Sequence, residues 1–266
     1  MLLSGGVIPM LETMISNSMT CEPAAALVLN LSCFDDAKPI IGSSDTLPFL
    51  VHLLRPESPQ SASCKHDALH ALFNLSTHPP NIPFLLAADI IGILNSLLAG
   101  CMWTENVLAV FINLVSSPDA KREMIAAPGF VSLLAVVLDT GEPLEQEQAV
   151  ACLLILCSSD EKCSHMVLQE GVIPALVSLT VNGTTRGREK AHKLLKLFRE
   201  QRQREQPPVL RHQEHQHRER EESIEVVPEP KAISKSKSRR LGKTISSLWK
   251  GKQEFLGASM LRKGTA

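Results

Sequence analysis

The sequence predicts an all-α fold, a right-handed helical solenoid of stacked repeats, and two recurring phrases carry this prediction. The first phrase is an apolar pentad of the type VIPML that occurs five times, centred on Pro9, Pro48, Gly92, Ser132 and Pro174. The second phrase follows each pentad about 22 residues later, centred on Asn30, Asn74, Asn113, Ile155 and Lys196. Phrases that recur together at intervals of 39 to 44 residues indicate units that bury their apolar faces against one another.

Each repeat is expected to contain a short leading helix, a middle helix and a longer helix that carries the Asn-Leu phrase. The middle helix begins at Gly or Asp, and Pro9, Pro48 and Pro174 fit its first turn, where a missing N–H is tolerated. Between Val172 and Leu179 the apolar residues have the spacing of a helix and not of a strand. Repeats of about 40 to 47 residues are typical of armadillo and HEAT arrays, so we expect an armadillo solenoid.

The solenoid is expected to span residues 1–206, with about four to five repeats of which the first is incomplete. The opening segment, LLSGGVIPML, contains a middle helix but no helix or polar cap before it, so further residues are expected upstream. A helix from about residue 187 to 206 carries apolar residues at helical spacing with charges around them. This pattern is that of a helix that caps the array.

Beyond the solenoid, residues 207–230 are predicted to form a disordered polar linker because they contain few aliphatic side chains. Residues 231–266 are predicted to form a basic tail with a short amphipathic helix, in which Leu241, Ile245 and Leu248 share one face. The candidate contact residues of this basic tail are Lys235, Lys237, Arg239, Arg240, Lys243, Trp249 and Lys250. Four interpretations stay open: a solvated terminus, a nuclear targeting signal, contact with an anionic membrane surface, and docking onto the chain's own acidic body.

The charge of the chain is divided between its two parts. Residues 1–184 contain 18 acidic residues and 6 Lys or Arg, whereas residues 185–266 contain 10 acidic residues and 21 Lys or Arg. An acidic body does not suit a nucleic acid, so no nucleic-acid partner is predicted. The longest apolar run, residues 149–157, is too short to span a membrane, and no signal peptide opens the chain. We therefore expect a soluble protein of the cytoplasm, the nucleus or both.

No catalytic constellation, cofactor site or metal site is predicted. The sequence contains no Gly-rich phosphate loop, HExxH, GxSxG or CxxC motif. The cluster of His212, His215 and His217 lies in a polar stretch without Cys, which is not a usual ligand pattern. The seven cysteines lie mostly in apolar segments, as Cys33 and Cys152 do, and are expected to be buried thiols.

The recurring asparagines are the best candidates for binding. Asn30, Asn74 and Asn113 occupy one position of the long helix, and stacking would align them along a groove with His70 beside them. A side-chain amide can donate and accept at once, so it can clamp the backbone of an extended peptide. The alternative is that these amides bond to the neighbouring repeat or to their own turns. The sequence does not decide between the two interpretations.

Several phrases carry a resemblance to a known family, among them GGVIPMLETMISN, HDALHALFNLSTHPPNIP, MVLQEGVIPALVSLTVNGTTRGREKAHKLLKLFREQRQRE and GKTISSLWKGK. Together they resemble the armadillo region of plant U-box ubiquitin ligases over nearly the whole chain. In that family an N-terminal U-box engages the ubiquitin-loaded conjugating enzyme, and the armadillo array binds a protein substrate or a regulatory receptor partner. The resemblance thus implies a role in protein ubiquitination.

No segment of this chain resembles a U-box, so the chain alone is not expected to catalyse ubiquitin transfer. A ubiquitin-conjugating enzyme is an expected partner only if a U-box lies upstream. The alternatives are a non-catalytic scaffold or a competitor of the full-length ligase. A nuclear-import adaptor is less favoured, because such adaptors place Trp four residues before each Asn, where this sequence has Ala26, His70 and Ala109. Without those indole walls, basic peptides should bind poorly.

Overall fold

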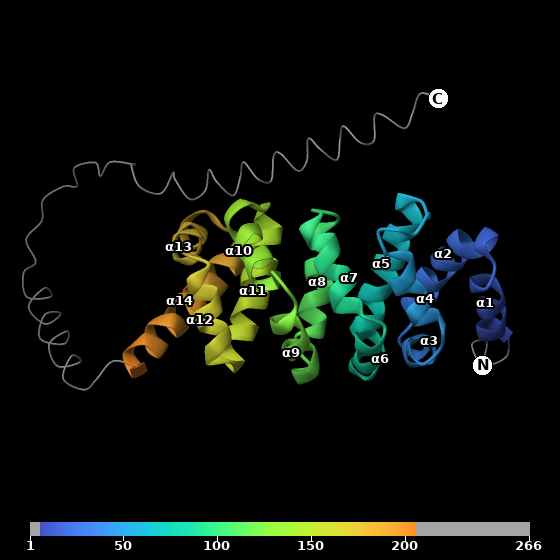
Figure 1. The fold of residues 1–266 in the computed structure, drawn as a ribbon, viewed down its shortest axis with the longest axis horizontal. Helices are drawn as coiled ribbons and strands as arrows, with labels where there is room; N and C mark the ends of the chain where they lie inside the picture. Colours follow the sequence, from blue (N-terminus) through green and yellow to red (C-terminus); the bar gives the residue numbers. More distant parts are fainter. Residues whose placement is uncertain (1–5, 206–266) are drawn as a thin grey trace, which may run out of the picture. The chain divides into compact units, whose positions relative to one another are not determined.

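The computed structural model describes residues 6–205, and these residues form α-helices joined by short turns, without a strand in that range (Figure 1). The all-α prediction is confirmed. The predicted linker, the basic tail and the cluster of His212, His215 and His217 lie outside the described residues. The helices are α1 (Ile8–Ile15), α2 (Cys21–Ser32), α3 (Lys38–Gly42), α4 (Thr46–Leu53), α5 (Ala62–Ser76), α6 (Ile82–Ala87), α7 (Ile90–Ala99), α8 (Thr104–Leu114), α9 (Pro118–Ala126), α10 (Phe130–Thr140), α11 (Pro143–Ser159), α12 (Glu161–Gln169), α13 (Ile173–Asn182) and α14 (Thr185–Glu205).

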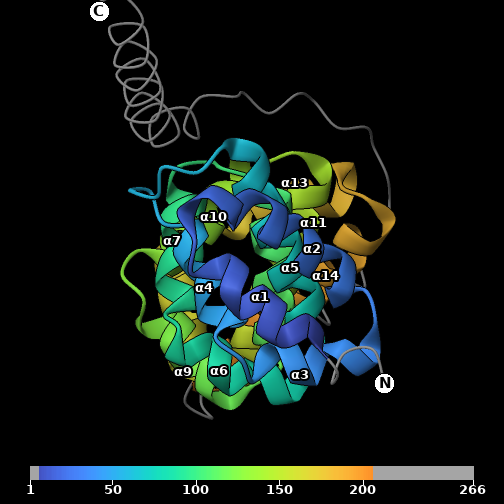
Figure 2. The same ribbon diagram turned by 90° about the vertical axis from the view of Figure 1, so that its right-hand side faces the viewer.

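These helices form the three-helix units that the sequence predicts: α3, α4 and α5, then α6, α7 and α8, then α9, α10 and α11, then α12, α13 and α14, preceded by α1 and α2. The long helix of each unit, α2, α5, α8, α11 and α14, is called the inner helix here. Successive inner helices are in contact along the chain. Figure 2 looks along the row and places α2, α5, α11 and α14 on one side, with α4, α6, α7 and α9 on the other.

The leading and middle helices of a unit meet at a sharp corner. The two helices are bent by 78° between α6 and α7, 86° between α9 and α10, and 89° between α12 and α13. Asp89, Gly129 and Gly171 stand at these corners with φ of 62°, 71° and 71°. Left-handed backbone suits Gly best and is tolerated by Asp, which explains why Gly or Asp stands before α7, α10 and α13.

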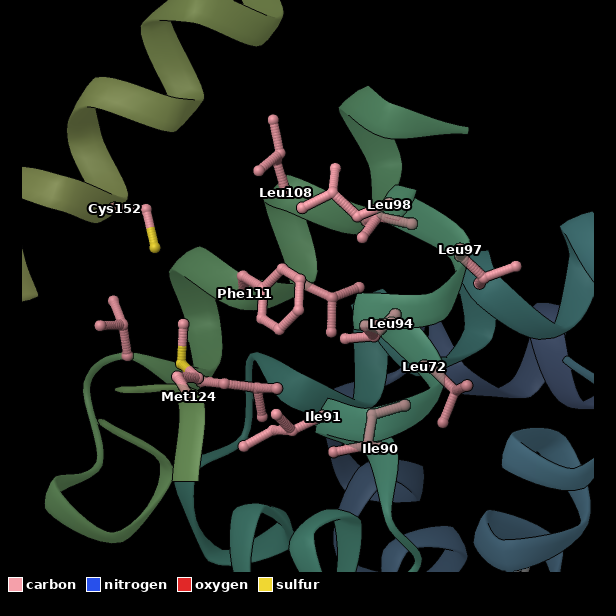
Figure 3. Close-up of a cluster of buried hydrophobic side chains, with 14 of the residues drawn as sticks. Leu72, Ile90, Ile91, Leu94, Leu97, Leu98, Leu108, Phe111, Met124 and Cys152 are labelled. Carbon is pink, nitrogen blue, oxygen red and sulfur yellow. The ribbon is translucent and has the colours of Figure 1, made fainter. Parts of the chain in front are cut away.

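The core runs through the units without interruption. Figure 3 shows the ring of Phe111 among aliphatic side chains from several helices, including Leu94 of α7 and Met124 of α9. The ring also contacts Phe130, with centroids 4.9 Å apart. On the inner helices, the position six residues before the Asn phrase holds small residues with no exposed surface, which let neighbouring helices approach closely: Ala24, Ala68, Val107 and Ala149.

A buried amide ties two units together near their leading helices. Asn81 is 1% exposed, and its Nδ2 donates to the backbone oxygens of Lys38 at 3.0 Å and Leu75 at 3.1 Å. Its Oδ1 faces Gly42 so closely that a Cβ atom there would lie 1.9 Å away. Gly42 is thus required by the approach of a side chain from the next unit.

No disulfide joins the seven cysteines, all of which fall within the described residues. Cys21, Cys64, Cys152, Cys157 and Cys163 are buried as predicted, and burial raises the pKa of Cys152 to about 12. Cys33, which directly follows the last residue of α2, is exposed, contrary to the prediction.

Within residues 6–205, no single helix is both long enough and apolar enough to cross a membrane, and three bent helix pairs reach the required length and composition only when taken together.

Candidate functional site

The inner helices bring the predicted asparagines into one register on successive units. Asn30 on α2 is exposed, and Asn74 on α5 and Asn113 on α8 are half-buried. The ladder face, as we call it, is the side of the inner helices that carries these asparagines and the residues one and four positions before each. At the same register, α11 has Ile155 and α14 has Lys196.

The asparagine amides link one repeat to the preceding one. Asn74 Nδ2 donates to Ser32 Oγ at 3.0 Å, and Asn113 Nδ2 donates to Ser76 Oγ at 3.0 Å. Each Ser hydroxyl in turn donates to a backbone oxygen of its own helix at 2.7 Å. Asn30 instead donates to the backbone oxygen of Ala26 at 2.8 Å.

The pairing also explains where the asparagines stop. The position that holds Ser32 and Ser76 is Val115 in the following repeat, so a donor on α11 would find no hydroxyl there, and the register residue is Ile155. Donor and acceptor are thus replaced together by apolar side chains. Unmatched buried donors are destabilising, which accounts for the joint change.

The side-chain oxygens of the three asparagines accept no hydrogen bond within the part of the chain that the structure describes. The amide nitrogens therefore bond to Ser or to the helix, and the carbonyl oxygens remain accessible acceptors. This geometry accommodates an inter-repeat link and a ligand contact at the same time.

His70 belongs to a polar cluster between α5 and α8. Its Nε2 contacts the Nδ2 of Asn106, and its ring lies 4.3 Å from that of His66, measured between centroids. The His66 ring lies 5.9 Å from that of Trp103, a half-buried residue with φ of 50° that precedes α8. Asn106, His66 and Trp103 were not predicted from the sequence.

Burial lowers the pKa of His70, and the nearby His66 lowers it further, while the charge of Asp67 acts in the opposite direction. A neutral imidazole can accept at Nε2 from the Asn106 amide, which an imidazolium cannot do. The cluster therefore joins α5 to α8 best when His70 carries no charge.

The last inner helix presents a different surface. α14 contains eight Lys or Arg and three Glu, and its buried face consists of Ala191, Leu194 and Phe198, as expected for a capping helix. No group of three or more His, Cys, Asp or Glu side chains in the described range is arranged to hold a metal ion.

Stacked three-helix units with a recurring Asn on the inner helix define an armadillo solenoid. Solved armadillo proteins share this fold: computationally designed armadillo repeat proteins for modular peptide recognition superpose with a TM-score of 0.65 at 20% identity, covering 74% of this chain and 84% of theirs. A designed armadillo repeat protein in complex with the peptide (KR)4 gives the same TM-score, identity and coverage.

The family model for the plant U-box protein ARM repeat region matches residues 6–218, and the chain belongs to this family. Over 259 residues it is 52% identical to U-box domain-containing protein 45 of Arabidopsis thaliana, which covers 95% of this chain and 34% of that protein. U-box domain-containing protein 7 of the same plant is 50% identical, covering 94% of this chain and 34% of that protein. The chain thus spans about a third of the length of the curated relatives it matches.

Proposed function

We propose that this chain is the partner-recognition part of a plant U-box ubiquitin-ligase system, and that it binds a protein substrate or a regulatory receptor through its ladder face. The proposal is supported by the family match over residues 6–218 together with a row of exposed and half-buried side chains at matched positions on the inner helices. Armadillo arrays are scaffolds whose extended surfaces suit protein partners.

The chemistry of the ladder face supports an extended peptide as ligand. One residue before each register position lies an apolar side chain that is not fully buried: Leu29, Phe73, Ile112, Leu154 and Leu195. Beside this apolar row, the oxygens of Asn30, Asn74 and Asn113 can accept from backbone N–H groups of a peptide. His70 adds a polar side chain at the α5 position. The apolar row would provide specificity, and the apolar row and the asparagine oxygens together would provide affinity.

Ubiquitin transfer requires a U-box, which the family resemblance assigns to a segment outside the matched third of the relatives. A ubiquitin-conjugating enzyme is then a partner only of a protein that includes such a segment. Without one, the chain would occupy the same partners and compete with the full ligase. Seven cysteines without a disulfide among them are compatible with the proposed cytoplasmic or nuclear location.

The test joins residues 1–266 to the U-box segment of Arabidopsis U-box domain-containing protein 45. The chimera is incubated with ubiquitin, activating and conjugating enzymes, and proteins captured by residues 1–266 from an Arabidopsis extract. We expect the chimera, and not residues 1–266 alone, to ubiquitinate captured proteins.

Two exposed phenylalanines make a matched pair of variants. Phe73 lies on the ladder face and is 37% exposed, whereas Phe84 lies on the leading helix α6 and is 48% exposed. Phe73→Asp should abolish modification of captured proteins and leave autoubiquitination intact, while Phe84→Asp should change neither. Equal modification by the two variants would exclude the ladder face as the recognition surface.

A further inference from the structure

The basic residues of α14 continue the ladder face at its end. Counted from Lys196, Arg188, His192 and Arg199 occupy the register positions that His66, His70 and Thr77 occupy relative to Asn74 on α5. Positions at i, i+4, i+8 and i+11 lie on one side of a helix. At the register position of Arg188 the earlier inner helices have Glu22, His66, Glu105 and Glu147, whereas α14 presents a stripe of basic side chains, defined as Arg188, His192, Lys196 and Arg199.

The charges of this stripe are available to a partner. All four side chains are exposed. Arg188, His192 and Arg199 have no ion-pair partner in the described residues. The ammonium of Lys196 lies 3.8 Å from Glu200, and the two side chains are 76% and 48% exposed. An exposed pair of that kind contributes little and is readily exchanged.

Neighbouring acids do not neutralise the stripe. Glu147 of α11 is bound elsewhere, since it accepts from Thr184 Oγ1 at 2.5 Å and pairs with Lys190 at 3.2 Å. The ladder-face positions of α11 hold Ala151, Leu154 and Ile155, none of which carries a charge. The stripe is therefore a local positive field on a body that is otherwise acidic.

We propose that the stripe on α14 binds an anionic segment of the partner protein, with carboxylate or phosphate groups, while the rest of that segment follows the ladder face. This inference rests on the proposed function and specifies the chemistry of the partner. Arginine forms bidentate hydrogen bonds with carboxylates and phosphates, so Arg188 and Arg199 provide the strongest contacts. The stripe also sets the direction of the segment, because only one end of the ladder face attracts an anion.

The size of the stripe favours a short peptide segment over a nucleic acid. Eleven residues of helix span about 16 Å, which is room for one or two anionic groups and not for a long phosphate backbone. The apolar side chain of Leu195 lies beside the stripe and suits a peptide side chain. Further along, the acidic body would repel a continuous polyanion.

The test measures the fluorescence anisotropy of labelled octaglutamate, and of a phosphoserine peptide of equal length, on the full 266-residue chain in 50 mM NaCl. The triple variant R188E/K196E/R199E should weaken binding of both by about tenfold or more, as expected for lost charge complementarity. The control K121E/K162E/K193E makes the same change in net charge outside the stripe and should stay within about twofold of the unaltered chain. Tighter binding of the phosphoserine peptide would identify phosphate as the preferred group, and tighter binding of octaglutamate would identify carboxylate.

The predicted basic tail is present in every variant, so photo-crosslinking locates the bound peptide. Crosslinks to residues 185–205 support the proposal, and crosslinks confined to residues 231–266 overturn it. Equal weakening by the two triple variants overturns it as well, and so does binding of a single-stranded oligonucleotide as tight as that of the peptides. If R188E/K196E/R199E melts below the control, the milder R188Q/K196Q/R199Q replaces it.

The proposed function is tested separately by the Phe73→Asp chimera. If Phe73→Asp abolishes partner modification while the α14 variants bind the peptides normally, the ladder face is the recognition surface and the anionic segment is excluded. If the α14 variants lose peptide binding but the two phenylalanine variants behave alike, the anion site exists and the proposed function fails.

Discussion

The inner helices α5 and α14 have the same place in their units, but α5 has small apolar side chains at positions where α14 has charged ones. Six and three residues before the Asn phrase, α5 has Ala68 and Ala71, both fully buried between neighbouring helices. At the same positions α14 has Lys190 and Lys193. Lys190 forms an ion pair with Glu147, and Lys193 is exposed. One helical framework thus packs through apolar side chains inside the array and presents a charged surface at its end.

Ala68→Lys should have the largest effect on the free energy of unfolding, because it places in the interior of the array the Lys that α14 has at the equivalent position. The new Lys would have no carboxylate partner comparable to Glu147, and a buried unpaired ammonium would cost roughly 4 kcal/mol or more. The measurement is the free energy of unfolding in urea. Lys193→Ala should change that energy by less than about 0.5 kcal/mol, since surface substitutions are usually small. Similar values for both variants would remove the distinction between the two helices.

Gly42→Ala tests the interior at another contact. Its Cβ would lie 1.9 Å from Asn81 Oδ1, so the buried amide must shift and weaken its bonds to Lys38 and Leu75. We expect a loss of about 2 kcal/mol in the free energy of unfolding. Gly100→Ala is the control, because its nearest neighbour would be 3.5 Å away. An equal loss in the control would show that helix backbone effects, and not displacement of the Asn81 amide, account for the result.

The asparagine link is expected to give a smaller effect. In a double-mutant cycle, Asn74→Ala and Ser32→Ala should show a coupling energy of about 1 kcal/mol, as for one buried hydrogen bond. Asn30→Ala, whose bond lies within its own helix, should change stability less. Replacing all three asparagines should also weaken partner binding if their oxygens face the ligand. Normal binding with a large fall in melting temperature would make them structural only.

On acidification, the α5–α8 interface and the α11–α14 interface should lose stability at different pH values. The pKa of His70 is lowered in the folded chain, so the unfolded chain binds a proton first, and stability at α5–α8 falls as pH drops below about 6.5. Burial alone would raise the pKa of Glu147, but its bonds to Thr184 and Lys190 lower it overall. That contribution at α11–α14 is present above about pH 4.5 and is lost below it.

The readout is the melting temperature between about pH 7.5 and about pH 3, a range that includes both declines. His70→Gln should flatten the first decline and leave the second, and Glu147→Gln should do the reverse. A single decline that neither variant alters would contradict this assignment.

The sequence was sufficient for the repeats, the helix order and the Asn register, because apolar periodicity is set by each residue's own neighbours. It could not show what the asparagine amides bond, since Asn74 and Ser32 lie 42 residues apart and only the stacking joins them. The cluster of His66, Trp103 and Asn106 could not be predicted from the sequence for the same reason. The pair His66 and His70 was visible at i and i+4, but the Trp103 ring, which His66 also contacts, belongs to the next repeat.

The chain of Asn and Ser hydrogen bonds has a mechanical consequence. These directional bonds resist sliding of α2, α5 and α8 past one another, because a small displacement lengthens the hydrogen bonds from Asn74 to Ser32 and from Asn113 to Ser76. Between α8 and α11 the equivalent residues are Val115 and Ile155, whose attraction has no preferred angle. The array is expected to bend at that joint, so that its first half acts as a rigid template and its charged end adjusts to whatever lies on it.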